Sequence, residues 1–463
     1  MMRGIRSTLV LLVIALGLGV YIYFVETDRS PAGTPAPLES VFDFASDDIV
    51  SISVTSETGD HTVIEKSDDR WQLVEPFTGN VDVTKVVSLS SSLASLEMQR
   101  VVTEPDDAAD LALFGLATPR IVVEVTTTSA SDLQLLIGER TPTGSDLYAT
   151  VADSNRVFLI SGFLDTTFNQ TTFDLRDKTI LDITRDQVDS LEVTSPDHTI
   201  RLRKAENQWS LVSPIAARAD LGVTDGIVGR LSTGQMVSVE AENTDNLEPY
   251  GLDQPQLIIT VGLGSSAATL LIGDTTPSGS AYARDAARGL VFTVDGSLVT
   301  ELEQEADEYR RRELFAFRPF NATALEFGYL GERWAFERIE AATEGESDTW
   351  RRTSPETGEV ETTAMDDLLV KLSNLRAESF VSSRDGTGLD SPVATVEVTF
   401  DDHEDRERVT FGQVSDEVFA VTGDEPGAAQ VNTRSWDDAI AALTPLQLMD
   451  RPAGRVAAVN FQS

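Results

Sequence analysis

The chain contains three histidines, the residues most able to bind a metal ion or move a proton near neutral pH. His61 and His198 lie in identical Asp-His-Thr triplets, 137 residues apart (198 − 61), and His403 lies in an acidic run. A shared metal site would need them brought together. Equivalent positions of a repeat are normally a module-length apart, so we interpret His61 and His198 as turn residues that enter a strand.

The acidic run around His403, from Asp401 to Asp405 (DDHED), could bind a hard cation through its carboxylates. It lacks the glycine-fixed loop of a calcium site and lies between two strand-like segments. We interpret it as the solvated tip of a hairpin.

Two glycine-containing segments, 141–145 (TPTGS) and 276–280 (TPSGS), could offer backbone N–H groups to an anion. Neither precedes a helix or carries the lysine of a phosphate-binding loop. Both are interpreted as turns that connect strands.

Trp71 and Trp209 could stack on a sugar ring. Each stands two residues before a leucine, Leu73 and Leu211, and this period-two spacing favours strand positions that face a core. We therefore expect buried indoles rather than a glycan-binding groove.

Sequence motifs of catalysis are missing. The chain has no Gly-x-Ser-x-Gly, Ser-x-x-Lys or His-Glu-x-x-His motif, and it has no cysteine for a disulfide, thiolate metal site or nucleophile. We expect no catalytic, cofactor-binding or metal-binding residue, and we expect that the protein is not an enzyme.

The residues just considered lie in a sequence that repeats three times. The markers are a tryptophan strand, a Gly-Leu-x-x-Pro turn and a strand that ends in glycine: Trp71, Trp209 and Trp350; Gly115, Gly251 and Gly388; Gly138, Gly273 and Gly412. They recur at spacings from 135 (273 − 138) to 141 (350 − 209). The chain is therefore predicted to contain three homologous modules, at residues 44–175, 176–309 and 310–451.

Each module is predicted to be α+β. In module 1, alternating residues predict a three-stranded meander, a helix over 83–96, and four strands at 121–125, 133–137, 147–151 and 157–160. Connections this short favour a mostly antiparallel sheet, with about one main helix per module. In module 3 the helix begins behind the candidate caps Thr362 and Thr363 and has one apolar face: Met365, Leu368, Leu369, Leu372 and Leu375.

The strand that opens each module marks the boundaries. Residues 190–193 match 324–327 at an offset of 134 (324 − 190), and the same offset leads to 458–461 near the end of the chain. We expect residues 452–463 to form a closing strand that covers the sheet edge of module 3. Segments 176–193 and 310–327 are expected to be shared between neighbouring modules, which would stiffen the array.

The N-terminal segment predicts an export route. Residues 9–25 carry no charge and follow Arg3 and Arg6, which indicates a transmembrane helix with its N-terminus in the cytoplasm. We expect residues 1–28 to form the cytoplasmic N-terminus and anchor, and 29–43 a Pro-rich stalk. The protein would then be a single-pass protein of the inner membrane, with most of the chain in the periplasm or extracytoplasmic space. A cleaved signal peptide is the alternative.

The composition also restricts the partners. The chain has 76 acidic and 36 basic residues and a net charge of −40, which argues against nucleic acid and against lying flat on an anionic membrane.

The anchor, the stalk, the repeated tryptophan, Gly-Leu-x-x-Pro and Ile-Gly motifs, and the closing Leu-Arg-Asp-Lys at 175–178 resemble the bacterial domain-of-unknown-function family numbered 4340, over about residues 45–450. Module 3 departs most from the pattern, because it has Thr-Phe-Gly at 410–412 and lacks the Thr-Pro-x-Gly-Ser turn. The resemblance implies a membrane-anchored extracytoplasmic protein, often encoded beside an ABC-type transport system of the gliding-motility kind. It implies no catalytic residue.

Three function classes stay open: a non-catalytic accessory or scaffold protein of an envelope transporter, with ABC transporter subunits as partners; an extracytoplasmic module that binds a glycan or peptide; and a hydrolase whose site forms only in three dimensions.

Overall fold

The computed structural model describes residues 38–104, 110–129, 133–154, 156–341, 347–401, 405–423 and 425–448. The expected anchor at 9–25, residues 29–37 of the expected stalk, His403 and the expected closing strand at 452–463 lie outside these residues. None of the helices within the described ranges is long and apolar enough to cross a membrane.

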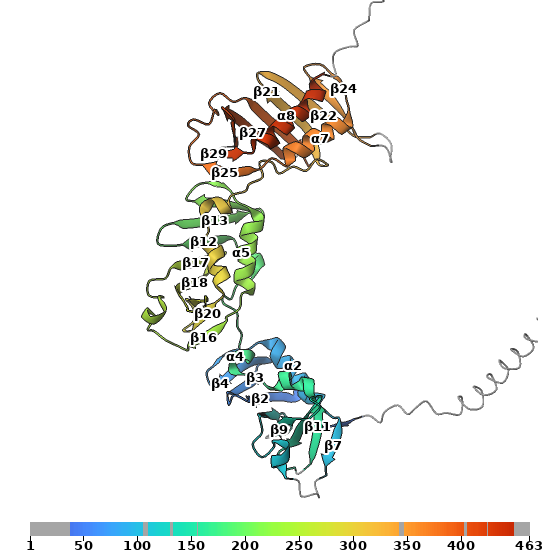
Figure 1. Cartoon of the computed structure of the whole chain (residues 1–463), viewed down its shortest axis with the longest axis vertical. Coiled ribbons are helices and arrows are strands. Elements are labelled where there is room, and N and C mark those ends of the chain that lie inside the picture. Colours follow the sequence, from blue (N-terminus) through green and yellow to red (C-terminus); the bar gives the residue numbers. More distant parts are fainter. Residues whose placement is uncertain are drawn as a thin grey trace, which may run out of the picture. The chain divides into compact units, whose positions relative to one another are not determined.

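Each of the three modules contains one nine-stranded sheet in which every neighbouring pair of strands is antiparallel (Figure 1). The strand order is the same in all three sheets, with the opening meander on one side, the four later strands beside it and a short strand at each edge. The α+β prediction and the threefold repetition are thereby confirmed.

Module 1 follows the predicted order closely. Its sheet runs β5 (Gly79–Asn80), β4 (Arg70–Glu75), β3 (His61–Ser67), β2 (Ile49–Thr55), β8 (Ile121–Thr127), β9 (Leu133–Arg140), β10 (Asp146–Val151), β11 (Val157–Ser161), β7 (Arg100–Thr103). The main helix is α2 (Val83–Ala94), and the short helices are η2 (Ser46–Asp48), η3 (Leu111–Phe114), η4 (Gly162–Leu164), α3 (Asp165–Phe168) and α4 (Thr172–Leu175). A two-stranded pair, β1 (Glu39–Ser40) with β6 (Glu97–Met98), and the buried Phe42 join part of the expected stalk to this module.

Module 2 has the sheet order β15 (Ala217–Arg218), β14 (Gln208–Ser213), β13 (Thr199–Ala205), β12 (Ser190–Thr194), β17 (Leu257–Leu263), β18 (Ser266–Thr275), β19 (Ala281–Asp285), β20 (Val291–Val294), β16 (Ser238–Ala241). Its main helix is α5 (Leu221–Thr233). The shorter helices are η5 (Arg185–Gln187), η6 (Glu248–Tyr250), α6 (Gly296–Leu302) and η7 (Ala306–Tyr309).

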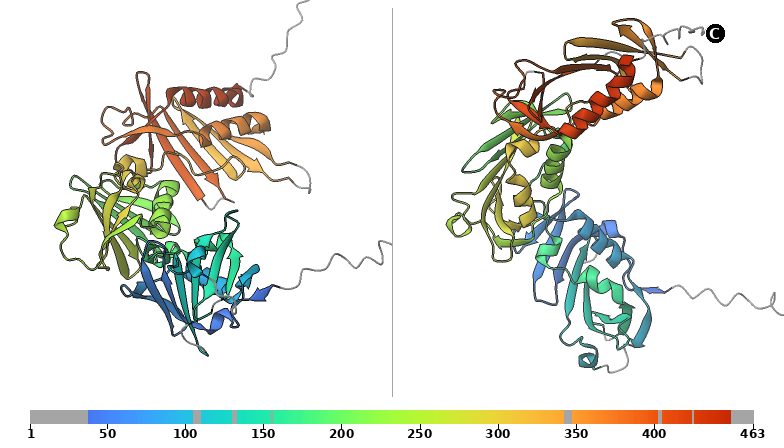
Figure 2. Two further views of the ribbon diagram at one scale, coloured as in Figure 1. Left: turned by 60° about the horizontal axis from the view of Figure 1, so that its bottom comes forward. Right: turned by 45° about the horizontal axis from the view of Figure 1, so that its top comes forward.

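Module 3 has the order β24 (Gly358–Val360), β23 (Thr349–Ser354), β22 (Glu332–Ile339), β21 (Ala322–Tyr329), β26 (Ala394–Phe400), β27 (Asp405–Val414), β28 (Glu417–Thr422), β29 (Ala428–Val431), β25 (Ala377–Val381). It carries two long helices, α7 (Thr362–Ser373) and α8 (Thr433–Leu448), where we expected one. Figure 2 shows α7 and α8, in orange and red, side by side over one face of the sheet.

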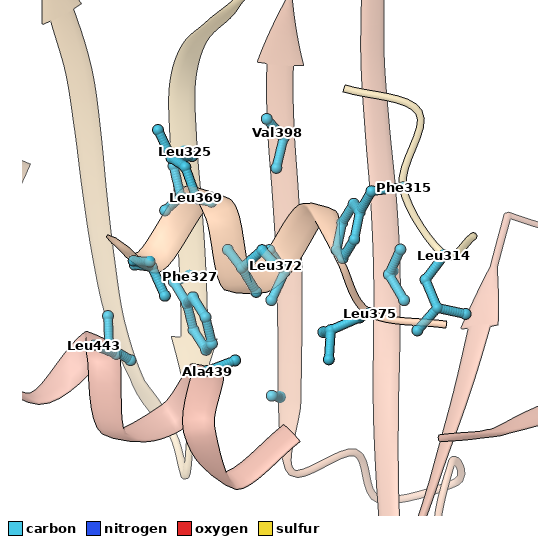
Figure 3. Packing of buried hydrophobic residues seen from close by; sticks show 14 of the residues in the cluster. Leu314, Phe315, Leu325, Phe327, Leu369, Leu372, Leu375, Val398, Ala439 and Leu443 are labelled. Atoms are coloured by element: carbon cyan, nitrogen blue, oxygen red, sulfur yellow. The ribbon is translucent and has the colours of Figure 1, made fainter. Parts of the chain in front are cut away.

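The second helix extends the core of module 3. Leu369 and Leu372 of α7 and Ala439 and Leu443 of α8 pack over strand residues such as Phe327, and all five are buried (Figure 3). Apolar residues at three- and four-residue spacing place one face of each helix on the sheet, as the sequence predicted for α7.

The predicted caps of α7 are wrong. Glu361 is the N-cap residue, and Thr362 and Thr363 are the first two residues of the helix. The hydroxyl of Thr363 donates a hydrogen bond to the Glu361 carboxylate at 2.8 Å, instead of accepting from a helix N–H group.

The chain divides into two compact units after Lys178. The first unit holds module 1, and the second holds modules 2 and 3.

Candidate functional site at the junction of modules 2 and 3

The structure places two of the three histidines in turns, as the sequence predicted. His61 is exposed at the first residue of β3, and its Nδ1 lies 2.9 Å from the hydroxyl of Thr55. His198 directly precedes β13, with Nδ1 3.1 Å from the hydroxyl of Ser195. Each imidazole ring thus makes a hydrogen bond across the turn of its own hairpin.

The two ends of the acidic run, Asp401 and Asp405, flank the connection between β26 and β27, and residues 402–404 lie outside the described residues. Asp401 follows β26 with a left-handed φ of 49°, and Asp405 begins β27. Within the part of the chain that the structure describes, His, Cys, Asp and Glu residues form no group of three that could hold a metal ion.

The two glycine-containing turns connect strands, as predicted. Gly144 and Gly279 adopt φ angles of +75° and +89° between β9 and β10 and between β18 and β19. Their backbones pack closely against the next helix, because a Cβ added to Gly162 would lie 2.6 Å from the Ser145 carbonyl oxygen, and one added to Gly296 would lie 2.2 Å from that of Gly279. Carbonyl groups thus line this contact, which is the opposite of an anion-binding nest.

The repeated tryptophans mark equivalent strands, but their burial differs. Trp209 and Trp350 are buried, whereas Trp71 is half-buried at the edge of the core of module 1. The Trp209 indole N–H donates to the Asp225 carboxylate at 2.7 Å, which satisfies its polar atom. The prediction of burial is therefore confirmed for two tryptophans and is only partly correct for Trp71.

Polar and charged side chains form a connected network where modules 2 and 3 meet, inside the second unit. The connecting segment, residues 310–313, contacts both modules. Arg310 forms an antiparallel bridge with Ala219 of module 2. Glu313 forms an antiparallel bridge with Arg376 of module 3. Between these bridges, the Arg311 N–H donates to the Arg218 carbonyl oxygen at 2.9 Å. The predicted sharing of this segment is confirmed for these residues.

Arg218 joins the two modules through side chains. Its backbone N–H and its Nε donate to the same carboxylate oxygen of Glu425, at 3.0 and 2.9 Å, and its Nη1 donates to Glu407 at 2.6 Å. The other Glu407 oxygen accepts from the backbone N–H of Ala316. We call Arg218, Glu407 and Glu425 the junction triad.

Arg310 lies next to the junction triad and contacts Phe380 and Glu425. It is 3% exposed, its guanidinium lies 3.7 Å from the centre of the Phe380 ring, and its Nη2 lies 3.8 Å from Glu425. A buried guanidinium is favourable only when charges or aromatic faces compensate the lost hydration. The junction supplies both, although the Nε of Arg310 has no hydrogen-bond partner among the described residues.

Beside the triad, a cavity of about 360 Å³ opens between β14, the start of α5 and the connecting chain. Trp209, Arg218, Arg311, Phe315 and Arg318 contribute to its wall. Burial, and then the neighbouring charge of Arg218, lowers the pKa of Arg311 below its ordinary value.

This junction was not found from the sequence. Glu407 and Glu425 are 189 and 207 residues from Arg218, and no local pattern pairs them. A signal did exist, since Arg310 to Arg312 is a run of three arginines in a chain of net charge −40.

Three repeated antiparallel-sheet modules, two of them joined by a charged junction, define a tandem-repeat protein of α+β modules. The chain belongs to the DUF4340 family, described as a domain of unknown function, whose model matches residues 71–220 and 209–392. No curated protein matches the chain. A solved structure, the DNA polymerase sliding clamp from Pseudomonas aeruginosa with ligand, aligns over 85% of this chain and 94% of that one with 7% identity. Its TM-score of 0.16 carries no argument about fold or function.

Proposed function

We propose that this protein is a non-catalytic scaffold, anchored in the inner membrane by residues 9–25, that presents its modules on the extracytoplasmic side as an auxiliary component of an ABC-type envelope transport system. The observation that carries the scaffold role is the junction triad. Side-chain contacts that join two modules would suit a protein that must present surfaces at set positions.

The repeated residues support the same role. Trp209, Trp350 and the left-handed Gly115, Gly251 and Gly388 all have folding explanations. The transporter association rests on the family resemblance, and the anchor rests on the sequence of residues 1–28.

A second candidate, an extracytoplasmic ligand-binding module, is favoured by the junction cavity. That cavity is near the lower end of the range of small-molecule sites, about 300–1,000 Å³. The two roles are compatible, because a ligand at the junction would contact both modules.

The anchor is tested by fusing a reporter that is active only outside the cytoplasm after Ser463 and by fractionating the cells. We expect an active reporter and full-length protein in the membrane fraction. Recovery of a soluble form that begins near Ala32 would show that the segment is cleaved.

The transporter association is tested by photo-crosslinking in the native host. A photoreactive residue replaces one of the exposed apolar residues Leu113, Phe320 or Leu330, and the buried Leu372 serves as the matched control. We expect products with a permease or ATPase-associated subunit from the exposed positions only. Unchanged transport on deletion of the gene, together with no transporter product from any position, would contradict the proposal.

A further inference from the structure

Arg311 differs from two other half-buried arginines, Arg120 and Arg156. Arg120 contacts Glu57 and Asp165 at 2.8 and 2.9 Å, Arg156 contacts Glu39 at 2.7 Å, and these carboxylates raise the pKa of each arginine above its ordinary value despite burial. In contrast, within the described residues Arg311 forms no ion pair. The charge of Arg311 is less well compensated than theirs.

The hydrogen-bonding capacity of Arg311 is also incompletely used. A guanidinium has five N–H donors. For Arg311 the structure gives one side-chain hydrogen bond, from Nη2 to the Phe315 carbonyl oxygen at 2.8 Å. Arg311 lines the junction cavity, and its remaining guanidinium N–H groups have no acceptor among the described residues.

Two further arginines line the same cavity. Arg318 is exposed, and its side chain has no ion-pair or hydrogen-bond partner in the described chain. Arg218 uses Nε and Nη1 in the junction triad, which leaves the N–H groups of Nη2. The carboxylates that also line the wall are engaged: Asp220 accepts from the N–H of Val223 at the start of α5, and Glu313 contacts Arg376.

We propose that the junction cavity is a binding site for a small ligand that carries an oxyanion, a carboxylate or a phosphate, held by Arg311 and Arg318 with Arg218 behind them. Guanidinium groups recognise these anions through paired N–H donors. Trp209 and Phe315 also line the cavity, although both residues are almost fully buried. A bound oxyanion would compensate the half-buried charge of Arg311. This site goes beyond the scaffold role, and it does not depend on the association with a transporter.

The test is calorimetric titration of the full-length protein in detergent, at constant ionic strength, with inorganic phosphate, with succinate and with neutral succinamide. We expect saturable binding of phosphate or succinate at one site per chain and none of succinamide. Phosphate binding alone assigns a phosphate ligand, and succinate binding alone assigns a carboxylate ligand. Absence of saturable binding by both anions, or equal binding of succinamide, would overturn the proposal.

Variants locate the site. Arg311→Gln and Arg318→Gln should each weaken binding roughly tenfold or more, as expected for a lost charge-assisted hydrogen bond. Arg434→Gln, which replaces an exposed arginine of α8 outside the cavity, should bind like the parent. If Arg311→Gln fails to fold, the anion affinity of the Arg318→Gln variant alone tests the site. Binding unchanged in Arg318→Gln and in any folded Arg311→Gln would show that the anion binds elsewhere.

Discussion

Gly138 of β9 lies directly against the backbone of Phe114, so that a Cβ added to Gly138 would be 2.2 Å from the Phe114 carbonyl oxygen. The same contact recurs between Gly273 and Tyr250 in module 2, at 2.1 Å. In module 3, the corresponding Gly412 would meet the Thr387 carbonyl oxygen at 2.4 Å. The residue after each carbonyl is the left-handed glycine of the Gly-Leu-x-x-Pro turn, so two of the three repeat markers are explained by one contact.

Gly138→Ala should therefore destabilise module 1 by about 1–3 kcal/mol or more, because the added carbon forces the turn and the strand apart. Gly144→Ala is the matched control, since its Cβ would meet no atom within 4 Å and its cost comes from the positive φ alone, about 1–2 kcal/mol. Urea unfolding followed by circular dichroism measures both. A Gly138→Ala protein as stable as the parent would contradict the contact.

Trp209→Ala should lower the free energy of unfolding of the second unit by about 3–5 kcal/mol, as large-to-small core changes do. Trp209→Phe keeps most of the ring volume and loses the hydrogen bond to the Asp225 carboxylate, so about 1.5–3 kcal/mol is expected for that loss. Trp71→Ala, at a half-buried position, should cost module 1 less. Equal costs for Trp71→Ala and Trp209→Ala would contradict their different burial.

The junction triad should be energetically coupled. Arg218→Gln and Glu425→Gln should each destabilise the second unit by about 1.5–3 kcal/mol, the range for hydrogen bonds to charged groups. The double variant should cost less than the sum, with a coupling of about 0.5–3 kcal/mol.

The exposed pair Arg201 and Glu192 of module 2 provides the control cycle, for which a coupling of about 0–1 kcal/mol is expected. Strictly additive effects of Arg218→Gln and Glu425→Gln would show that the junction does not depend on this contact.

Tyr309 should make the second unit sensitive to alkali. Burial raises the pKa of Tyr309 to about 12 from an ordinary value of 10.0. Because the folded-state pKa is the higher one, this contribution to stability is fully present below pH 10 and is lost as the pH rises from 10 through about 12, by about 3 kcal/mol.

Tyr309→Phe should lack this alkaline loss and should cost little at pH 7, since the buried hydroxyl has no hydrogen-bond partner among the described residues. Stability measured from pH 8 to 12 by urea unfolding compares the two proteins. Identical pH profiles would contradict the assignment.

Local patterns predicted most of the fold. The alternation around Ile52 and Val54 and the helical spacing of Leu368 and Leu372 are set by burial of one face, so sequence alone reveals them. The edge strands β5 and β7 escaped prediction because they are two and four residues long and bury little. Helix α8 was also missed, although Trp436 and Leu443 mark its buried face.

The junction could not be predicted in the same way. Arg218 meets Glu407 and Glu425 only after two separate sheets have formed, and charged residues carry no periodic signal of their partners. The half-buried position of Trp71 likewise depends on neighbours in the folded module rather than on its strand.

The connecting segment 310–313 forms a bridge to module 2 at one end and to module 3 at the other. As a result, the boundary between these modules is a stretch of chain, and no single peptide bond separates them cleanly. The two family matches, 71–220 and 209–392, begin within β4 and β14 and overlap at residues 209–220, so they do not coincide with the folded modules. A cut within 310–313 would therefore leave one of the two modules without its bridge.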